Sequence, residues 1–259
     1  MDKLEKNDYS QATLLFEGVT NSKPVIFSVL ENNVAGEVYV DDAVKPQTAL
    51  VVLLDMLFLA GNSNTEVCED ISNLLENKIF TGKEWGYWDF YCMNDQLRVG
   101  MERVMGPKIE GYPTRLTFAL DHEVFDSFRN WRERIPEGFS MEVIDRDFLM
   151  KHGRDQEFWA SSTKRFGFVL TKGGEEVSEC SSVFVGGGMA EISIETKESY
   201  RRQGFATLVC SAFIEHCLSS GIEPNWGCWD FREGSAELAS KLGFVEVSRD
   251  VVFGVKGIQ

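Results

Sequence analysis

The stretch ESYRRQGFATLVCSAFIEHCL, residues 198–218, places two arginines and a glycine directly before a long apolar segment. It follows AEISIET (190–196), which is typical of a strand, so we expect a strand-to-helix junction here. The first N–H groups of a helix lack partners inside the helix, and the helix dipole adds partial positive charge there. Gly204 leaves room for an anion to approach the backbone, and Arg201 and Arg202 add fixed charge. The junction therefore predicts a site for phosphate or pyrophosphate, although the same physics would also suit sulfate or a carboxylate.

The arginine-glycine segment belongs to a longer pattern. RRQGFA (201–206) matches R-x-x-G-x-A and resembles the pyrophosphate loop of the GNAT superfamily of acetyl-CoA-dependent N-acetyltransferases. AEISIETKESYRRQGFATLV resembles the central strand, loop and helix of that family. GSAELASKLGFVEV (234–247) resembles its later helix and strand, and PNWGCWD (224–230) supplies the strand between them. The second half looks most like a subgroup that includes zwittermicin A resistance acetyltransferases.

The resemblance implies a fold and a cofactor site. The fold would be α/β (α+β), a GNAT fold in the C-terminal half, with a mixed central sheet flanked by helices. The loop N–H groups would hold the pyrophosphate of acetyl-CoA, and the end of the central strand would bind its pantetheine arm through the main chain. Cys228 to Asp230 would line the opposing wall. The expected cofactor-binding residues are Ile194, Glu195, Thr196, Arg201, Arg202, Gln203, Gly204, Phe205, Ala206, Thr207, Arg232 and Ser235, with no metal.

The catalytic groups are less well specified by the pattern. An amine must lose a proton before or as it attacks a thioester, and Glu191 resembles in position the general base of some relatives. Strand alternation predicts that Glu191 and Glu195 share one face, and we take both as catalytic candidates; a solvent-facing carboxylate or an ion-pair partner is the alternative for each. Ala239 stands where many relatives carry a tyrosine acid. Ser235 is a candidate for a helix cap or for cofactor contact.

The first half predicts a second α/β lobe. We expect a helix over 9–19, strands over 24–30, 36–42, 86–93 and 115–120, one long buried strand over 48–60, and helices over 63–80 and 94–106. In the second half we expect a strand at 139–144, a helix at 145–152, three strands within 165–196, and closing strands at 244–250 and 251–255. The halves share an element order, which indicates either a diverged duplication, with a degenerate GNAT-like N-terminal lobe, or two unrelated lobes. Pro136 and Gly138 place the expected boundary between domains 1–135 and 136–259.

The amino-acid composition narrows the classes of molecule that the protein is expected to bind. The 259 residues carry a formal net charge of −15, which disfavours nucleic acid and is compatible with a cationic substrate such as an amine. The apolar run at 48–61 is too short and too charged for a membrane span, and the polar N-terminus predicts no signal peptide, so we expect a cytoplasmic protein.

We expect acetyl transfer to a primary amine of a small molecule. The alternatives are a protein or peptide acceptor, or a module that binds acyl-CoA without turnover; the oligomeric state stays open.

Overall fold

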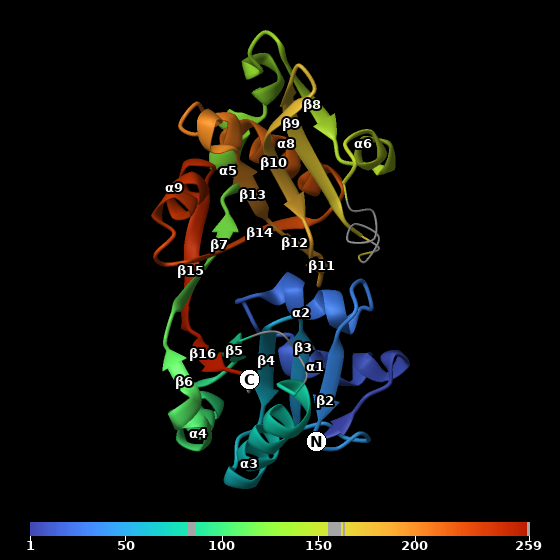
Figure 1. The fold of residues 1–259 in the computed structure, drawn as a ribbon, viewed down its shortest axis with the longest axis vertical. Helices are drawn as coiled ribbons and strands as arrows, with labels where there is room; N and C mark the ends of the chain where they lie inside the picture. The colour runs from blue at the N-terminus through green and yellow to red at the C-terminus, as the bar shows by residue number, and fades with distance from the viewer. Residues whose placement is uncertain (82–85, 155–161, 163, 258–259) are drawn as a thin grey trace. The chain divides into compact units, whose positions relative to one another are not determined.

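The chain folds into two compact units (Figure 1). The computed structural model describes residues 1–81, 86–154, 162 and 164–257. Unit 1 comprises Met1–Arg115 and Arg249–Gln259, and unit 2 comprises Leu116–Ser248. The chain therefore divides at residues 115/116 and 248/249, and not at the single position 135/136 that the Pro136 break suggested.

Unit 1 is built around a seven-stranded sheet with the order β1-β2-β3-β4-β5-β16-β6. Its strands are β1 (Asp2–Lys3), β2 (Glu37–Val40), β3 (Thr48–Leu53), β4 (Met56–Gly61), β5 (Tyr87–Cys92), β6 (Ile109–Gly111) and β16 (Phe253–Lys256). Its helices are η1 (Lys6–Ala12), α1 (Thr13–Phe16), α2 (Lys23–Leu30), α3 (Thr65–Leu74), η2 (Leu75–Ile79), α4 (Asp95–Met105) and η3 (Gly106–Lys108).

Three sequence predictions in unit 1 are corrected. The segment 24–30 is helix α2, not a strand; Pro24 lies in its first turn, and residues 24–30 are all buried, so no alternation distinguishes the two. The segment 48–60 is a hairpin, not one strand. The chain reverses at Leu54, whose φ is 54°, and β3 and β4 pair as antiparallel strands up to Leu53 and Met56. The helix expected at 9–19 is a 3₁₀ segment followed by a short α-helix that ends at Phe16.

Unit 2 contains two sheets, with the orders β13-β10-β9-β8 and β11-β12-β14-β7-β15. Their strands are β7 (Thr114–Leu120), β8 (Phe139–Val143), β9 (Phe166–Lys172), β10 (Glu175–Ser182), β11 (Val185–Gly186), β12 (Met189–Glu191), β13 (Ser193–Thr196), β14 (Glu223–Trp229) and β15 (Phe244–Val251). The helices are α5 (His122–Phe125), η4 (Asp126–Phe128), η5 (Trp131–Arg134), α6 (Arg146–Lys151), η6 (Glu198–Tyr200), α8 (Phe205–Ser219) and α9 (Glu233–Lys241).

The two halves of the sequence exchange strands. β16, from the end of the chain, lies between β5 and β6, while β7, from the first half, lies between β14 and β15. β16 pairs antiparallel with β5 from Phe253↔Phe90 to Lys256↔Tyr87. The expected closing pair is therefore wrong, because β15 and β16 belong to different sheets. Because the end of the chain returns to the sheet of unit 1, unit 1 consists of two separate segments and the units have two boundaries in the sequence.

The same element order occurs in both units, which confirms the mixed α/β class. In unit 1, β2, β3 and β4 form an antiparallel meander, and β5 runs parallel to β4 after α3. In unit 2, β8, β9, β10 and β13 are antiparallel neighbours, and β14 runs parallel to β12 after α8.

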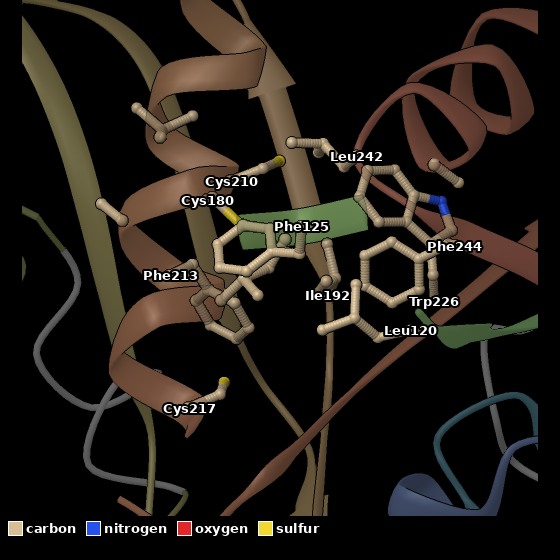
Figure 2. Close-up of a cluster of buried hydrophobic side chains, with 14 of the residues drawn as sticks. Leu120, Phe125, Cys180, Ile192, Cys210, Phe213, Cys217, Trp226, Leu242 and Phe244 are labelled. Atoms are coloured by element: carbon tan, nitrogen blue, oxygen red, sulfur yellow. The ribbon is translucent and has the colours of Figure 1, made fainter. Parts of the chain in front are cut away.

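The core of unit 2 holds α8 against the sheets (Figure 2). Phe213, Cys210 and Cys217 of α8 are buried together with Cys180 of β10 and Trp226 of β14. Such burial of a 15-residue helix leaves it little freedom to shift. The position of its N-terminus, where the arginine-glycine loop enters, is thereby fixed.

Candidate functional site

The central strand of unit 2 forks at Glu191. β12 pairs with β14 up to Glu191↔Asn225, and the Ile192 N–H donates to the Asn225 carbonyl at 2.9 Å. β13 then continues in the other sheet, paired with β10 from Ser193 to Thr196. Among the strands that the structure describes, β13 lies at the edge of that sheet, and an edge strand can pair with another extended group. The expected residues Ile194, Glu195 and Thr196 lie on this edge.

The loop before α8 has the conformation expected of an anion site. Gly204 is the N-cap of α8 with φ 85°, and Arg202 also has a positive φ of 63°. The N-cap Gly204 has no side chain with which to cap this helix, whereas Asn64 and Asn94 accept hydrogen bonds from the first turns of α3 and α4. A Cβ at Gly204 would meet no atom within 4 Å. The space beside Gly204, at the start of α8, is therefore open.

A groove of about 460 Å³ runs along this loop. Its walls come from β13, the loop, the start of α8 and one side of α9. Lys241 of α9, which the sequence analysis did not single out, lies in the wall and donates from Nζ to Thr207 Oγ1 at 3.2 Å. The lining residues are Thr196, Tyr200, Arg201, Arg202, Gly204, Phe205, Ala206, Thr207, Gly234, Glu237, Leu238 and Lys241.

Three side chains at this junction are held by contacts with β13, the loop and β8. Arg201 donates from Nε to the Thr196 carbonyl at 3.2 Å, and Gln203 donates from Nε2 to the Ser199 carbonyl at 3.2 Å. The Phe205 ring is buried and packs 4.8 Å from the ring of Phe139. These contacts hold the loop main chain, which is the part that would face an anion.

Glu191 lies at the fork and is buried. It is 8% exposed, and Asn225, at 2% exposed on the facing strand, donates from Nδ2 to Glu191 Oε2. The amide fixes one carboxylate oxygen at the point where the two strands separate. Sequence reasoning missed Asn225, because a partner on a parallel strand 34 residues away leaves no local signal.

The structure does not place Glu191 and Glu195 on one face as expected. Ile192 is 7% exposed, so Glu191 and Ile192 are buried in succession and the alternation of the strand is broken. Glu195 is exposed and faces Glu179 across the β10–β13 pair; Glu179 in turn accepts a 2.5 Å hydrogen bond from Arg154.

Five of the expected cofactor residues do not line the groove: Ile194, Glu195, Gln203, Arg232 and Ser235. Arg232 is exposed at the start of α9, with its guanidinium 5.7 Å from the Phe231 ring. Ser235 does not cap α9; its Oγ accepts a 3.1 Å hydrogen bond from the indole of Trp226. Ala239 is fully buried. On the expected opposing wall, Cys228 is buried and Asp230 is exposed.

Neither a metal-ligand cluster nor a membrane-spanning helix occurs in the described ranges. Among residues 1–81, 86–154, 162 and 164–257, no group of three or more His, Cys, Asp or Glu side chains is arranged to hold a metal ion. Over the same part of the chain, no helix has the length and apolar character needed to cross a membrane.

Known proteins resemble the chain over nearly its full length. A family model described as GNAT acetyltransferase matches residues 14–253. An uncharacterized N-acetyltransferase, YdfB of Bacillus subtilis (strain 168), is 27% identical over 264 residues, 98% of each chain. The crystal structure of a GCN5-related N-acetyltransferase-like protein from Streptococcus suis 89/1591 matches with a TM-score of 0.69 and 23% identity, covering 96% of this chain and 99% of that one. A tandem GNAT protein from the clavulanic acid biosynthesis pathway matches with a TM-score of 0.64 and 11% identity, covering 99% and 98%.

Proposed function

Because the chain belongs to the GNAT acetyltransferase family, we propose that it transfers the acetyl group of acetyl-CoA to a primary amine of a small molecule. The observation that carries the proposal is the fork in unit 2. There a buried carboxylate lies between two separating strands, next to an open strand edge that leads to an uncapped helix N-terminus. The strand edge, the helix start and the carboxylate would serve the arm, the diphosphate and the amine of the reaction.

The groove residues fit acetyl-CoA, which would supply an acetyl thioester. The N–H groups of the first turn of α8 would donate to the diphosphate, and Arg201, Arg202 and Lys241 would neutralise its charge. The open edge of β13 would hydrogen-bond the amide groups of the pantetheine arm as an added strand. Arg232 and Ser235 remain candidates for outer contacts, although neither lines the groove.

Glu191 is the proposed proton acceptor for the incoming amine, directly or through water. It is the carboxylate at the fork, and the hydrogen bond from Asn225 would fix its orientation there. Glu195 is the second candidate, but its exposure makes it better suited to attracting a cationic acceptor than to removing a proton. A base is needed because a primary amine is largely protonated at neutral pH.

The net charge of −15 supports a cationic acceptor, since a negative surface raises the local concentration of cations. A small amine meets this condition without the extended docking surface that a protein acceptor needs. The acceptor is therefore assigned to the class of small primary amines, such as polyamines and amino sugars.

The test is acetyl-CoA turnover by the full-length protein with a panel of amines, read as free thiol. The panel contains polyamines, amino sugars and peptides with free α- or ε-amines; matched alcohols serve as controls. We expect turnover with at least one small amine and none with its alcohol. Turnover with peptides alone would refute the small-molecule assignment. Acetyl-CoA binding without turnover on any amine would indicate a binding module.

A further inference from the structure

Unit 1 contains a cavity of its own, of about 330 Å³. It lies where the parallel strands β4 and β5 end: their pairing stops at Leu59↔Cys92, and the Met93 N–H donates to the Leu59 carbonyl at 2.8 Å. The carboxyl ends of parallel strands are a frequent ligand position in α/β sheets, and this volume is at the small end of the range for ligand pockets. Its lining residues are Leu15, Gly18, Val19, Thr20, Asn21, Ala60, Gly61, Tyr91, Cys92, Met93, Asn94, Asp250 and Val251.

The polar wall of this cavity is held by hydrogen bonds. Asn21 is 5% exposed and donates from Nδ2 to Asp250 Oδ2 at 3.1 Å. Ser22 donates from Oγ to Asn21 Oδ1 at 2.7 Å, which fixes the orientation of the amide. On another side of the cavity, Asn94 donates from Nδ2 to the Gly61 carbonyl at 2.9 Å. The polar groups are thus pre-arranged.

The charge of the lining selects the class of ligand. Asp250 supplies a carboxylate, and no lysine or arginine is among the described lining residues. Burial raises the pKa of the Cys92 thiol, so this side chain stays neutral. Tyr91 also lines the cavity, and its ring is held in place by stacking on Phe58 at 4.8 Å. A carboxylate in a lining without lysine or arginine favours an organic cation over an anion.

The cavity is not a second pyrophosphate site. The junction from β4 to α3 reads GNSN, without arginine, and Asn64 Oδ1 accepts a 2.8 Å hydrogen bond from the Val67 N–H. The first turn of α3 is therefore capped by the chain's own side chain, unlike that of α8.

We propose that this cavity binds a small organic cation carrying a primary ammonium group, with Asp250 as its counter-ion and Asn21 as a positioning residue. The site uses residues of unit 1 alone, and it is separate from the transfer groove in unit 2. It therefore adds an amine-binding site that is independent of catalysis.

The test monitors Met93, which lines the cavity, in the full-length protein without acetyl-CoA. The methionine methyl groups are labelled with carbon-13, and the Met93 signal is assigned with Met93→Leu. We expect 1,4-diaminobutane to shift this signal saturably and 1,4-butanediol, its uncharged counterpart, to leave it unmoved. Asp250→Asn keeps an oxygen for Asn21 but removes the charge, and it should weaken binding at least tenfold, as expected for a charge-assisted contact.

Two further variants make the result specific. Asp147→Asn, which changes an exposed aspartate of unit 2, should bind as the wild type does. Gly18→Phe should block binding without strain, because a Cβ at Gly18 meets no atom within 4 Å. An unmoved Met93 signal at saturating diamine, equal shifts with the diol, or undiminished binding by Asp250→Asn would each overturn the proposal. None of these readouts depends on turnover, so they separate this proposal from the acetyltransferase assignment.

Discussion

Gly204 allows the proposed cofactor loop to be tested against a matched control. Its φ of 85° lies in the left-handed region, where any other residue costs about 1–2 kcal/mol, but a Cβ there meets no atom within 4 Å. Gly138 has nearly the same φ, 82°, and the same free space, but it does not line the groove. Gly204→Glu and Gly138→Glu should therefore lose similar stability, a few degrees in Tm for a chain of this size.

Only the Gly204 variant should lose coenzyme A. Two unit charges about 5 Å apart repel by roughly 1–3 kcal/mol at effective dielectric constants of about 80 to 20. A diphosphate carries about two charges, so Gly204→Glu should weaken coenzyme A binding at least roughly 30-fold. The assay is calorimetric titration of each variant with coenzyme A, after Tm has confirmed folding. Wild-type affinity in Gly204→Glu, an equal loss in Gly138→Glu, or two equivalent sites per wild-type chain would refute the assignment of the groove.

Three further predictions concern catalysis, pH dependence and domain integrity. Glu191→Gln keeps the contact with Asn225 but removes the base, so turnover should fall roughly 100-fold while the affinity for coenzyme A stays unchanged. The loss of turnover should shrink at high pH. Wild-type turnover at neutral pH would mean that Glu191 is not the base, and Glu195 or Asp230 would be tested next. Burial, together with the nearby Asp55 carboxylate, raises the pKa of Asp89 from 3.8 to about 6. The folded state therefore binds this proton more tightly than the unfolded state, and stability falls as pH rises from about 4 to 6. Asp89→Asn should raise the free energy of unfolding by roughly 1–3 kcal/mol at pH 7.5, with the gain shrinking by pH 4.5; equal gains at both pH values, measured by urea denaturation, would contradict this. A fragment of residues 136–259 should be insoluble or inactive, because it lacks β7 and leaves β16 without a partner; a soluble, fully active fragment would refute this.

The sequence predicted well where its patterns are local. The strand, loop and helix around Gly204 follow from spacing and turn chemistry, and α3 and α4 follow from their apolar periodicity and asparagine caps. The family resemblance supplied the fold class, which the family match and the element order confirm.

The predictions failed where burial removes periodicity or where the partner is distant. The residues of 24–30 are all buried, so helix and strand could not be distinguished, and the reversal at Leu54 lies inside an uninterrupted apolar run. The break at Ile192 depends on pairing with Asn225, and Lys241 reaches Thr207 only in the folded unit. Such contacts join residues about 30 positions or more apart and leave no mark on local spacing.

The exchange of β7 and β16 sets the order in which the molecule can be completed during synthesis. The unit 1 sheet needs Phe253–Lys256 between β5 and β6, and these residues leave the ribosome after every strand of unit 2. Until then β5 and β6 each have an unpaired edge, which is a template for pairing with other chains. Nascent unit 1 should therefore be the aggregation-prone part of the chain, and chaperone demand should end only when the last strand is inserted.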